Sequence, residues 1–344
     1  MKKLFITHDG QVVIREVAVP DPTPGRVLVR THYSAISTGT EVSTIAMRRA
    51  NPGGDDVPSG YSLAGRVVAV GEGVEGISVG DLVSCGGWNI SVHAETVSVP
   101  VNLCVVLDPG SDLRQAAFST IAAISLQAVR LAHLSLGETA VILGTGIIGQ
   151  FAAILARLSG ARTVVVGHRN QMRLELARQM GAELAALSTR SDPVDLVRDF
   201  TGGIGADAVL NCAKTEGAEP LVQALNMTRE KGRVVIVGGM PIEMPRTPLF
   251  RKELNVVISR STGPGRYDPD YEVKGIDYPI AYVRWTGRRN QAECARLIGK
   301  GCLDVDSLIT HEFTFASASE AFDLVTGRGD ETLGVVLKYG PAER

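Results

Sequence analysis

Several features that would assign a chain to a specialised class are scarce or missing in this sequence. Five cysteines are scattered over 344 residues and none forms a Cys-x-x-Cys pair, which argues against a disulfide framework and favours a reducing cytoplasm. No apolar run approaches the roughly 18 residues of a membrane-spanning helix, and residues 1–9 turn polar too early for a signal peptide. The formal net charge of −2 gives no reason to expect nucleic acid or an anionic membrane as partner. A small-molecule substrate is the partner to expect.

What the sequence does contain is a change of pattern near residue 115. Before it, short alternating strands such as 27–33 and 64–70 are separated by Gly- and Pro-rich segments, which is typical of a β-barrel. After a helix expected over 116–134, strands alternate with helices, and this predicts a parallel, doubly wound sheet. The strands are expected at 140–143, 163–166, 208–210, 234–237 and 256–258. The helices are expected at 148–158, 171–180, 193–200 and 218–226. Beyond residue 261 the chain is irregular and then gives helices near 291–299 and 317–325 and a strand at 334–338.

A glycine fingerprint follows the first strand of the alternating half. The strand runs into Gly144-x-Gly146-x-x-Gly149, and an apolar helix follows. The first glycine permits a tight turn, the second lets the backbone approach a pyrophosphate, and the third lets helix and strand pack closely. Because both the strand and the helix are present, the fingerprint predicts dinucleotide binding. The residues expected to contact the cofactor here are Gly144, Thr145, Gly146, Ile147, Ile148 and Gly149.

The end of the second strand bears on the choice of cofactor. A Rossmann domain usually carries there an acidic residue that binds the ribose of NAD and repels a 2′-phosphate. In this sequence the strand is followed by His168, Arg169 and Asn170, with no acid. Arg169 can pair with a phosphate, and its neighbours can donate hydrogen bonds to it. NADP(H) is therefore favoured over NAD(H), although the segment could also be an ordinary solvated loop.

Later strand ends are expected to line the nicotinamide half of the cofactor, because ligands of open α/β sheets bind outside the carboxyl ends of the strands. Cys212 and Gly238 follow two of these strands, and Ser259 and Ser261 follow the next. Cys212 is expected to be a small packed residue and not a nucleophile, since the sequence places no base near it.

Together with the fingerprint, the motifs at 60–65 (GYSLAG), 79–83 (VGDLV), 93–95 (HAE) and 232–238 (GRVVIVG) resemble the medium-chain dehydrogenase/reductase superfamily over nearly the whole chain. The segments 36–41, 117–120, 261–271, 282–286 and 289–290 resemble more narrowly its zinc-free branch, found as the N-terminal half of bi-domain oxidoreductases. Those relatives carry a second, Gfo/Idh-like half, and this chain is expected to be a free-standing version.

The resemblance implies an α/β fold with two domains. A GroES-like β-barrel catalytic domain would comprise residues 1–118 and 262–344, and a Rossmann NADP-binding domain with a doubly wound parallel sheet would comprise 119–261. Relatives often join their coenzyme domains through the last sheet strand, here 255–258, whose unpaired apolar edge would otherwise be a liability. A homodimer is therefore expected.

The resemblance also implies that zinc is absent. The positions of the catalytic metal ligands in zinc-dependent relatives match Thr38, Tyr61 and Ala116, and none of these is a strong zinc ligand. The four closely spaced cysteines of the structural zinc lobe are also missing, because only Cys85 and Cys104 occupy that region. No metal is predicted at either site.

Without a Lewis acid, other groups must stabilise or protonate the alkoxide that hydride transfer creates. Thr40 keeps the position whose hydroxyl relays protons in the relatives, and Tyr61 would project a phenol where a histidine ligand stood. Glu41 occupies the place of an acid usually engaged in structural ion pairing, and His93 could reach the site. For Tyr61 a packed aromatic with a bonded hydroxyl is an equal alternative. Glu41 is favoured as structural, and His93 as a surface histidine or one behind the site.

The segment 261–290 concentrates aromatic and charged side chains in an irregular stretch. Aromatic faces with Arg and Asp groups suit a polyhydroxylated ring, although such a loop could equally be a dimer or domain contact. The residues expected to contact substrate are Thr38, Tyr267, Arg284 and Trp285.

Three functions are consistent with the sequence. The leading hypothesis is a zinc-independent, NADP(H)-dependent oxidoreductase that interconverts an alcohol and a ketone on a sugar- or cyclitol-like molecule in a biosynthetic pathway. The second is an NADPH-dependent enone or quinone C=C reductase, which would be indifferent to Tyr61→Phe. The third is a non-catalytic dinucleotide-binding protein, which would bind NADPH without turnover.

Overall fold

The computed structural model describes residues 1–340, which form two compact units. Unit 1 comprises Met1–Ala123 with the chain from Thr262 onward, and unit 2 comprises Ile124–Ser261. No helix within residues 1–340 is both long enough and apolar enough to span a membrane.

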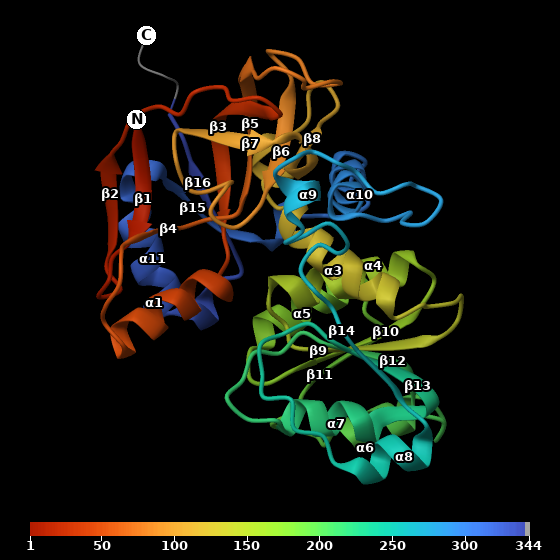
Figure 1. Cartoon of the computed structure of the whole chain (residues 1–344). Helices are drawn as coiled ribbons and strands as arrows, with labels where there is room; N and C mark the ends of the chain where they lie inside the picture. Colours follow the sequence, from red (N-terminus) through yellow and green to blue (C-terminus); the bar gives the residue numbers. More distant parts are fainter. Residues whose placement is uncertain (341–344) are drawn as a thin grey trace. The chain divides into compact units, whose positions relative to one another are not determined.

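Unit 2 is built on a six-stranded parallel sheet with strand order β11-β10-β9-β12-β13-β14. In chain order its strands are β9 (Thr139–Leu143), β10 (Arg162–Gly167), β11 (Leu184–Leu187), β12 (Ala206–Asn211), β13 (Thr228–Ile236) and β14 (Asn255–Ile258). Figure 1 shows helices on both faces of this sheet. The helices are α4 (Ile147–Leu158) and α5 (Gln171–Gln179) on one face and α6 (Pro193–Phe200), α7 (Glu219–Met227) and α8 (Arg246–Lys252) on the other. The predicted doubly wound sheet is confirmed.

The direction of winding reverses between β9 and β12, where the strand order changes. In open α/β sheets this reversal places a crevice at the carboxyl ends of the two strands. The start of α6 is set by local sequence. The Asp192 side chain caps this helix by accepting from the backbone N–H groups of Val194 and Asp195, and Pro193 occupies its first turn. Both features are common helix starts. The turn after β9 therefore lies where a nucleotide is expected.

Unit 1 contains a seven-stranded sheet of order β15-β16-β3-β5-β6-β8, with β7 paired to β3, and a smaller sheet of order β2-β1-β4. All pairs are antiparallel except β15 with β16. The strands of the large sheet are β3 (Arg26–Ile36), β5 (Ser62–Val70), β6 (Leu82–Gly86), β7 (Thr96–Pro100), β8 (Cys104–Val106), β15 (Ile309–Thr314) and β16 (Gly334–Lys338). Those of the small sheet are β1 (Lys2–Ile6), β2 (Val12–Glu16) and β4 (Val57–Pro58).

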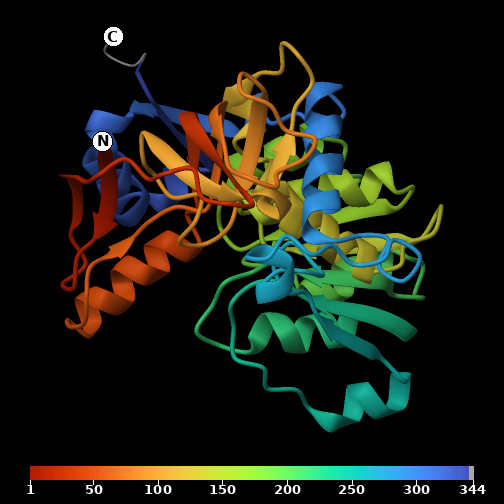
Figure 2. The same cartoon turned by 45° about the horizontal axis from the view of Figure 1, so that its top comes forward.

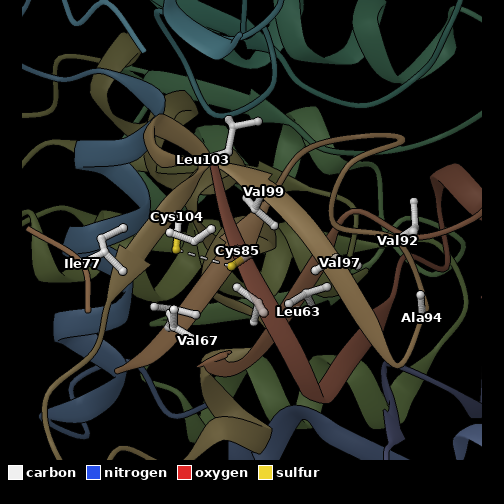
Figure 3. Close-up of a cluster of buried hydrophobic side chains, with 13 residues drawn as sticks. Leu63, Val67, Ile77, Cys85, Val92, Ala94, Val97, Val99, Leu103 and Cys104 are labelled. Atoms are coloured by element: carbon white, nitrogen blue, oxygen red, sulfur yellow. Dashed lines mark hydrogen bonds between the residues drawn. The ribbon is translucent and has the colours of Figure 1, made fainter. Parts of the chain in front are cut away.

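Buried side chains of the large sheet of unit 1, many of them valines, pack together in one hydrophobic core, as Figure 3 shows. Alternate residues of β3, β5 and β7 point into this core, as the period of a half-buried strand requires. Cys85 on β6 lies opposite Cys104 on β8, with the two sulfur atoms 3.7 Å apart. Both thiols are free and buried. Burial raises the pKa of the Cys85 thiol well above its ordinary value.

Segments from both ends of the described chain make a second core in unit 1. Figure 2 shows the N-terminal strands beside a C-terminal helix, α11 (Ala318–Gly327). Leu4 and Ile6 of β1 pack in one cluster with Phe322 of α11 and Ile45 of α1 (Thr40–Ala50). The remaining helices are α2 (Leu113–Ala116), α3 (Ser119–Leu131), which crosses the boundary between the units, α9 (Pro269–Glu272) and α10 (Gly287–Gly299).

Some expected elements differ in the structure. The helix predicted over 116–134 is α3, which is shorter at both ends, and the residues before it form the separate short helix α2. Between the two, the Ser119 hydroxyl donates to the carbonyl of Ala116. Helix α10 begins at Gly287, four residues before the predicted start, because the Thr286 side chain caps it by accepting from the Arg289 N–H. Helices α1 and α8 and strand β11 were not predicted. Neither α1 nor α8 has a side-chain cap that the sequence could have announced.

Candidate active site

The glycine turn after β9 has the geometry that the fingerprint requires. Gly144 has φ +99°, which glycine adopts at low cost, and a Cβ there would lie 2.8 Å from the backbone nitrogen of Ala213. A Cβ on Gly149 would lie 1.9 Å from the carbonyl oxygen of Gly144, so only glycine allows α4 to pack this closely on the turn. Gly146 caps α4, and a Cβ there would meet no atom within 4 Å. The turn is therefore tightly packed at Gly144 and Gly149 and has open space at Gly146.

The open front of this turn fits a dinucleotide. Backbone N–H groups at the start of a helix such as α4 bind phosphates, because they lack partners within the helix and carry partial positive charge. Thr145 and Ile147, on either side of Gly146, are buried, as is Gly149, and Ile148 is half-buried. The fingerprint residues are thus brought together at the place where the sheet order reverses.

The ends of β12, β13 and β14 form the next part of this edge. Gly238 packs against the turn after β12, since a Cβ there would lie 1.9 Å from the carbonyl oxygen of Ala213. Burial raises the pKa of the Cys212 thiol to about 12, so this residue is not a thiolate at neutral pH. Ser259 has a buried hydroxyl oxygen without a hydrogen-bond partner among residues 1–340, and such a group is expected to meet a ligand or water. Ser261 adopts φ +50° at the end of the unit.

The end of β10 carries the residues predicted to select the cofactor. His168 and Arg169 are exposed, and Asn170 is half-buried. The His168 imidazole Nδ1 lies 3.4 Å from the Ser188 hydroxyl. The Asn170 side chain caps α5 by accepting from the N–H of Arg173 at 3.1 Å. Asn170 therefore has a structural task that the sequence analysis did not foresee, whereas His168 and Arg169 lie at the surface beside the strand end.

A buried carboxylate organises the candidate catalytic region of unit 1. Glu41 is fully buried and accepts three hydrogen bonds. Its Oε2 accepts from the backbone N–H of Ser37 at 2.7 Å, and its Oε1 accepts from the Ser59 hydroxyl and from His93 Nε2, the latter at 2.9 Å. Several donors are what a buried carboxylate needs to offset its lost hydration. Glu41 joins the start of α1 to the turn after β3, to Ser59 and to His93.

His93 is fully buried, so it does not lie at the surface. Its Nδ1 lies 2.7 Å from the Ser34 hydroxyl, which lies 2.9 Å from the hydroxyl of Tyr339. Because the Glu41 carboxylate can only accept, the pattern fits an imidazole that carries its hydrogen on Nε2 and accepts at Nδ1. The imidazole therefore holds the Glu41 carboxylate in place by donating to its Oε1.

Tyr61 connects to the same network through Ser37. Its phenol is buried and donates to the Ser37 hydroxyl at 2.9 Å, and the N–H of Thr40 donates to the same hydroxyl at 3.3 Å. Burial raises the pKa of Tyr61 to about 12, so the phenol stays protonated near neutral pH and can donate a hydrogen bond. Its ring lies 6.4 Å from that of Trp88. Thr38 is half-buried and the side chain of Thr40 is exposed.

Four members of this network were missed by the sequence analysis. Ser37 lies inside the motif 36–41, but nothing in a serine's sequence context announces that it will accept from a tyrosine 24 residues away. The other three are Ser34, Ser59 and Tyr339. Tyr339 reaches the network only because β16 pairs with β3.

The segment 261–290 uses many of its polar side chains to hold itself together. Arg266 forms a buried ion pair with Glu272, whose Oε1 also accepts from the N–H of Tyr267 at 3.0 Å. Tyr267 has φ +67°, an uncommon conformation for a bulky residue, and is half exposed, with the Arg266 guanidinium 4.1 Å from its ring centroid. A strained and exposed aromatic of this kind is characteristic of ligand-binding segments.

Arg284 and Trp285 lie further along the same segment. The Arg284 guanidinium stacks 3.9 Å from the centroid of the Trp285 ring. Arg284 is exposed and Trp285 is half-buried. Such a pair offers an aromatic face together with a fork of hydrogen-bond donors.

The positions matched to catalytic zinc ligands do not suit a metal. Ala116 has no side-chain ligand atom, and the Tyr61 phenol stays protonated and donates a hydrogen bond to the Ser37 hydroxyl. A threonine hydroxyl such as that of Thr38 is a weak zinc ligand. Within residues 1–340 no three His, Cys, Asp or Glu side chains lie close enough together to hold a metal ion. Thr38, Tyr61 and Ala116 therefore supply no strong zinc ligand.

Comparison with known families assigns the chain to a class. Residues 23–114 match the alcohol dehydrogenase GroES-like domain, and residues 148–273 match the zinc-binding dehydrogenase family. Together the two matches cover well over half of the sequence. The chain belongs to the medium-chain dehydrogenase/reductase superfamily, a group of oxidoreductases, with a GroES-like domain and a Rossmann-type parallel sheet.

Individual relatives extend over nearly the whole chain. A sorbitol dehydrogenase of Halalkalibacterium halodurans is 27% identical over 98% of this chain and 99% of its own. A D-arabitol-phosphate dehydrogenase of Enterococcus avium is 26% identical over 97% and 95%. A putative zinc-binding dehydrogenase of Sinorhizobium meliloti 1021, solved bound to NADP, has the same fold, with a TM-score of 0.80 at 22% identity over 98% of each chain.

Proposed function

We propose that the protein is a zinc-independent, NADP(H)-dependent oxidoreductase that interconverts an alcohol and a ketone on a sugar- or cyclitol-like small molecule in a biosynthetic pathway. The observation that carries this proposal is Tyr61. At a position matched to a zinc ligand, it presents a buried, protonated phenol held by Ser37. A phenol in that place can donate a hydrogen bond to the substrate oxygen and so stabilise its negative charge, which a metal ion would otherwise do.

In this mechanism the chain binds the dinucleotide and handles the proton. The Gly146 face and the N-terminus of α4 would hold the pyrophosphate, and Arg169 with His168 would hold the 2′-phosphate. When bound, the cofactor supplies a hydride to the carbonyl carbon or takes one from the alcohol. The buried hydroxyl of Ser259, which has no hydrogen-bond partner among residues 1–340, would pair with the nicotinamide end.

Tyr61 acts on the substrate oxygen. As negative charge develops on it during reduction, the phenol hydrogen turns from the Ser37 hydroxyl toward the substrate, and Ser37 donates its own hydrogen to the phenol oxygen. The proton then passes to the product alcohol, and the reverse transfer accompanies oxidation. Glu41 and His93 are positioning residues here, since Glu41 accepts from the Ser37 N–H and His93 bonds the Glu41 carboxylate. Thr40, whose side chain is exposed, would connect Ser37 with solvent, so that a solvent proton restores the Tyr61 phenol after reduction.

The substrate class is supported by the relatives and by the segment 261–290. The two curated relatives above are named for sorbitol and for D-arabitol phosphate, both polyhydroxylated. Tyr267, Arg284 and Trp285 offer aromatic faces beside guanidinium groups, which suit the carbon face and the hydroxyls of such a molecule. Thr38 would add a hydroxyl contact.

The test is turnover of a panel of polyols, cyclitols and ketoses with NADPH and NADH, for the wild type, Tyr61→Phe and the control Tyr33→Phe. The proposal expects NADPH-dependent ketone reduction that falls about 100-fold or more in Tyr61→Phe and stays unchanged in Tyr33→Phe. Reduction of enones that is indifferent to Tyr61→Phe would instead establish the C=C reductase. Tight NADPH binding without turnover of any substrate would establish a non-catalytic protein.

A further inference from the structure

Unit 1 has a cavity of about 420 Å³. It is separate from the network of Tyr61 and Glu41, because no residue of that network lines it. It lies between β1, the segment 17–20, the loop 89–94 and strands β3 and β7. Its lining residues are Met1, Lys3, Val17, Ala18, Pro20, Arg26, Asn89, Ile90, Val92, Ala94, Thr96, Val97 and Ser98. Small-molecule sites typically have volumes of about 300–1,000 Å³, so this cavity is large enough for a ligand.

The charge of the cavity has one sign. Lys3 and Arg26 line it, and no Asp or Glu does. Burial lowers the pKa of both Lys3 and Arg26, and no carboxylate opposes this effect. Among residues 1–340 neither side chain forms an ion pair, and the register of β1 with β2 places Arg15 directly opposite Lys3. Arg15 is itself paired with Asp56, and the Lys3 ammonium lies 5.4 Å from the centroid of the Phe5 ring. Within the cavity, Lys3 and Arg26 therefore face no carboxylate.

The polar groups of the cavity are held in place. The Arg26 guanidinium donates from Nε to the Ser98 hydroxyl at 3.0 Å and from Nη2 to the Ser98 carbonyl at 2.6 Å. This fixes the direction of the guanidinium fork. Thr96 lies two residues from Ser98 on β7, hence on the same side of the strand. The cavity therefore has a pre-organised guanidinium, a hydroxyl and an ammonium.

The remaining wall is mostly apolar. Val92, Ala94 and Val97 line the cavity and also belong to the buried core drawn in Figure 3. Val17, Pro20 and Ile90 complete this wall. A ligand that fills the cavity would thus place an anionic group on Lys3 and Arg26 and an apolar group against the valines.

We propose that this cavity is a binding site for a small organic anion, a carboxylate or a phosphate monoester that carries an apolar group. Lys3 and Arg26 bind the anionic group and the wall of Val92, Val97 and Ile90 binds the apolar one. The proposal concerns unit 1 alone and does not depend on the function proposed above.

Isothermal titration calorimetry tests the site with benzoate and phenyl phosphate as probes and with benzamide as the uncharged analogue of benzoate. Saturable binding of at least one anion is expected, with benzamide at least tenfold weaker. Lys3→Gln is expected to weaken the anion at least tenfold, as loss of a charge-assisted hydrogen bond predicts. Arg26→Lys, which keeps the charge but loses the fork, should weaken it less than Lys3→Gln does.

The matched control is Lys2→Gln, because Lys2 is the neighbouring lysine of β1 and is exposed on its other side. It should bind the anion as the wild type does, and so should Tyr61→Phe, which reports on the candidate active site. Equal binding of benzoate and benzamide, equal weakening by Lys2→Gln and Lys3→Gln, or no saturable binding of either anion would overturn the proposal. Unchanged thermal unfolding of Lys3→Gln establishes that its fold is intact.

Discussion

At the scale of single residues the account depends on a phenol that keeps its proton. Tyr61 is buried and donates a hydrogen bond to the Ser37 hydroxyl, and the Ser37 backbone N–H donates to Glu41. The match of Tyr61 to a zinc-ligand position came from the motif at 60–65 and needed only the sequence. The hydrogen-bond partner of Tyr61 could not be predicted, because serine occurs in turns, at strand ends and on surfaces. Only the folded chain brings the Ser37 hydroxyl to the phenol.

The elevated pKa of Tyr61 predicts how stability depends on alkaline pH. The pKa is about 12 in the folded protein and about 10 in an unfolded chain, so the unfolded chain loses this proton first. The contribution of Tyr61 to the free energy of unfolding is therefore complete below about pH 10 and is lost as pH rises to about 12. Urea unfolding measured between about pH 9 and about pH 11 should show a shallower loss of stability in Tyr61→Phe than in the wild type. Parallel losses would show that the phenol titrates normally.

Arg169 is the residue on which cofactor preference is predicted to depend. Arg169→Ala should raise the KM for NADPH by about tenfold or more, the effect of losing a charge-assisted pair with phosphate, and leave the KM for NADH nearly unchanged. Steady-state kinetics with both cofactors measures this directly. Equal effects on the two, or a wild-type preference for NADH, would remove the claim.

At the scale of elements, the turn between β9 and α4 separates two kinds of glycine. Gly149→Ala places a methyl group 1.9 Å from a carbonyl oxygen, so the turn must shift, at a cost of about 1–3 kcal/mol. Gly146→Ala has open space around it, so stability should be retained while the methyl group blocks the approach of the pyrophosphate.

Thermal unfolding and NADPH fluorescence titration of the two variants test this distinction. A lower Tm is expected for Gly149→Ala, and a wild-type Tm with weakened NADPH binding for Gly146→Ala. Gly299→Ala, at an uncrowded position in α10, should behave as the wild type in both assays. Undiminished binding by Gly146→Ala would mean that the cofactor does not approach this turn.

Elements with a clear apolar period were predictable, and a side-chain cap helped to fix the start of a helix. Strand β16 was predicted with its observed bounds, as was helix α6, which begins with Asp192 and Pro193. Helix α1 was missed because Gly39 gives it no side-chain cap and because its motif was interpreted as part of the site. Strand β11 has only four residues, too few to show a pattern.

At the scale of the whole molecule, contacts between distant parts of the sequence were beyond prediction. Ser34 and Tyr339 are 305 residues apart and share a hydrogen bond behind His93. Such a contact follows from the pairing of β16 with β3, and the sequence of neither strand specifies its partner. The glycine fingerprint, in contrast, was recognisable because its strand, turn and helix are contiguous.

The edge of the unit 2 sheet predicts the oligomeric state. β14 is the edge strand, and Ile258 on it is 63% exposed, which is unfavourable unless a second chain covers it. We expect a homodimer, and we expect Ile258→Lys to convert it to a monomer in light scattering after gel filtration. Ile242→Lys, at another exposed isoleucine of unit 2, should stay dimeric. A monomeric wild type would contradict the prediction.

The central claim is that an organic proton donor, and no metal ion, serves the reacting oxygen. Turnover of ketose with NADPH, measured after chelator treatment and with the metal content determined by mass spectrometry, tests it most directly. The account predicts that protein without stoichiometric zinc retains its full rate and that added zinc does not raise it. Activity that disappears with the metal and returns with zinc would contradict it.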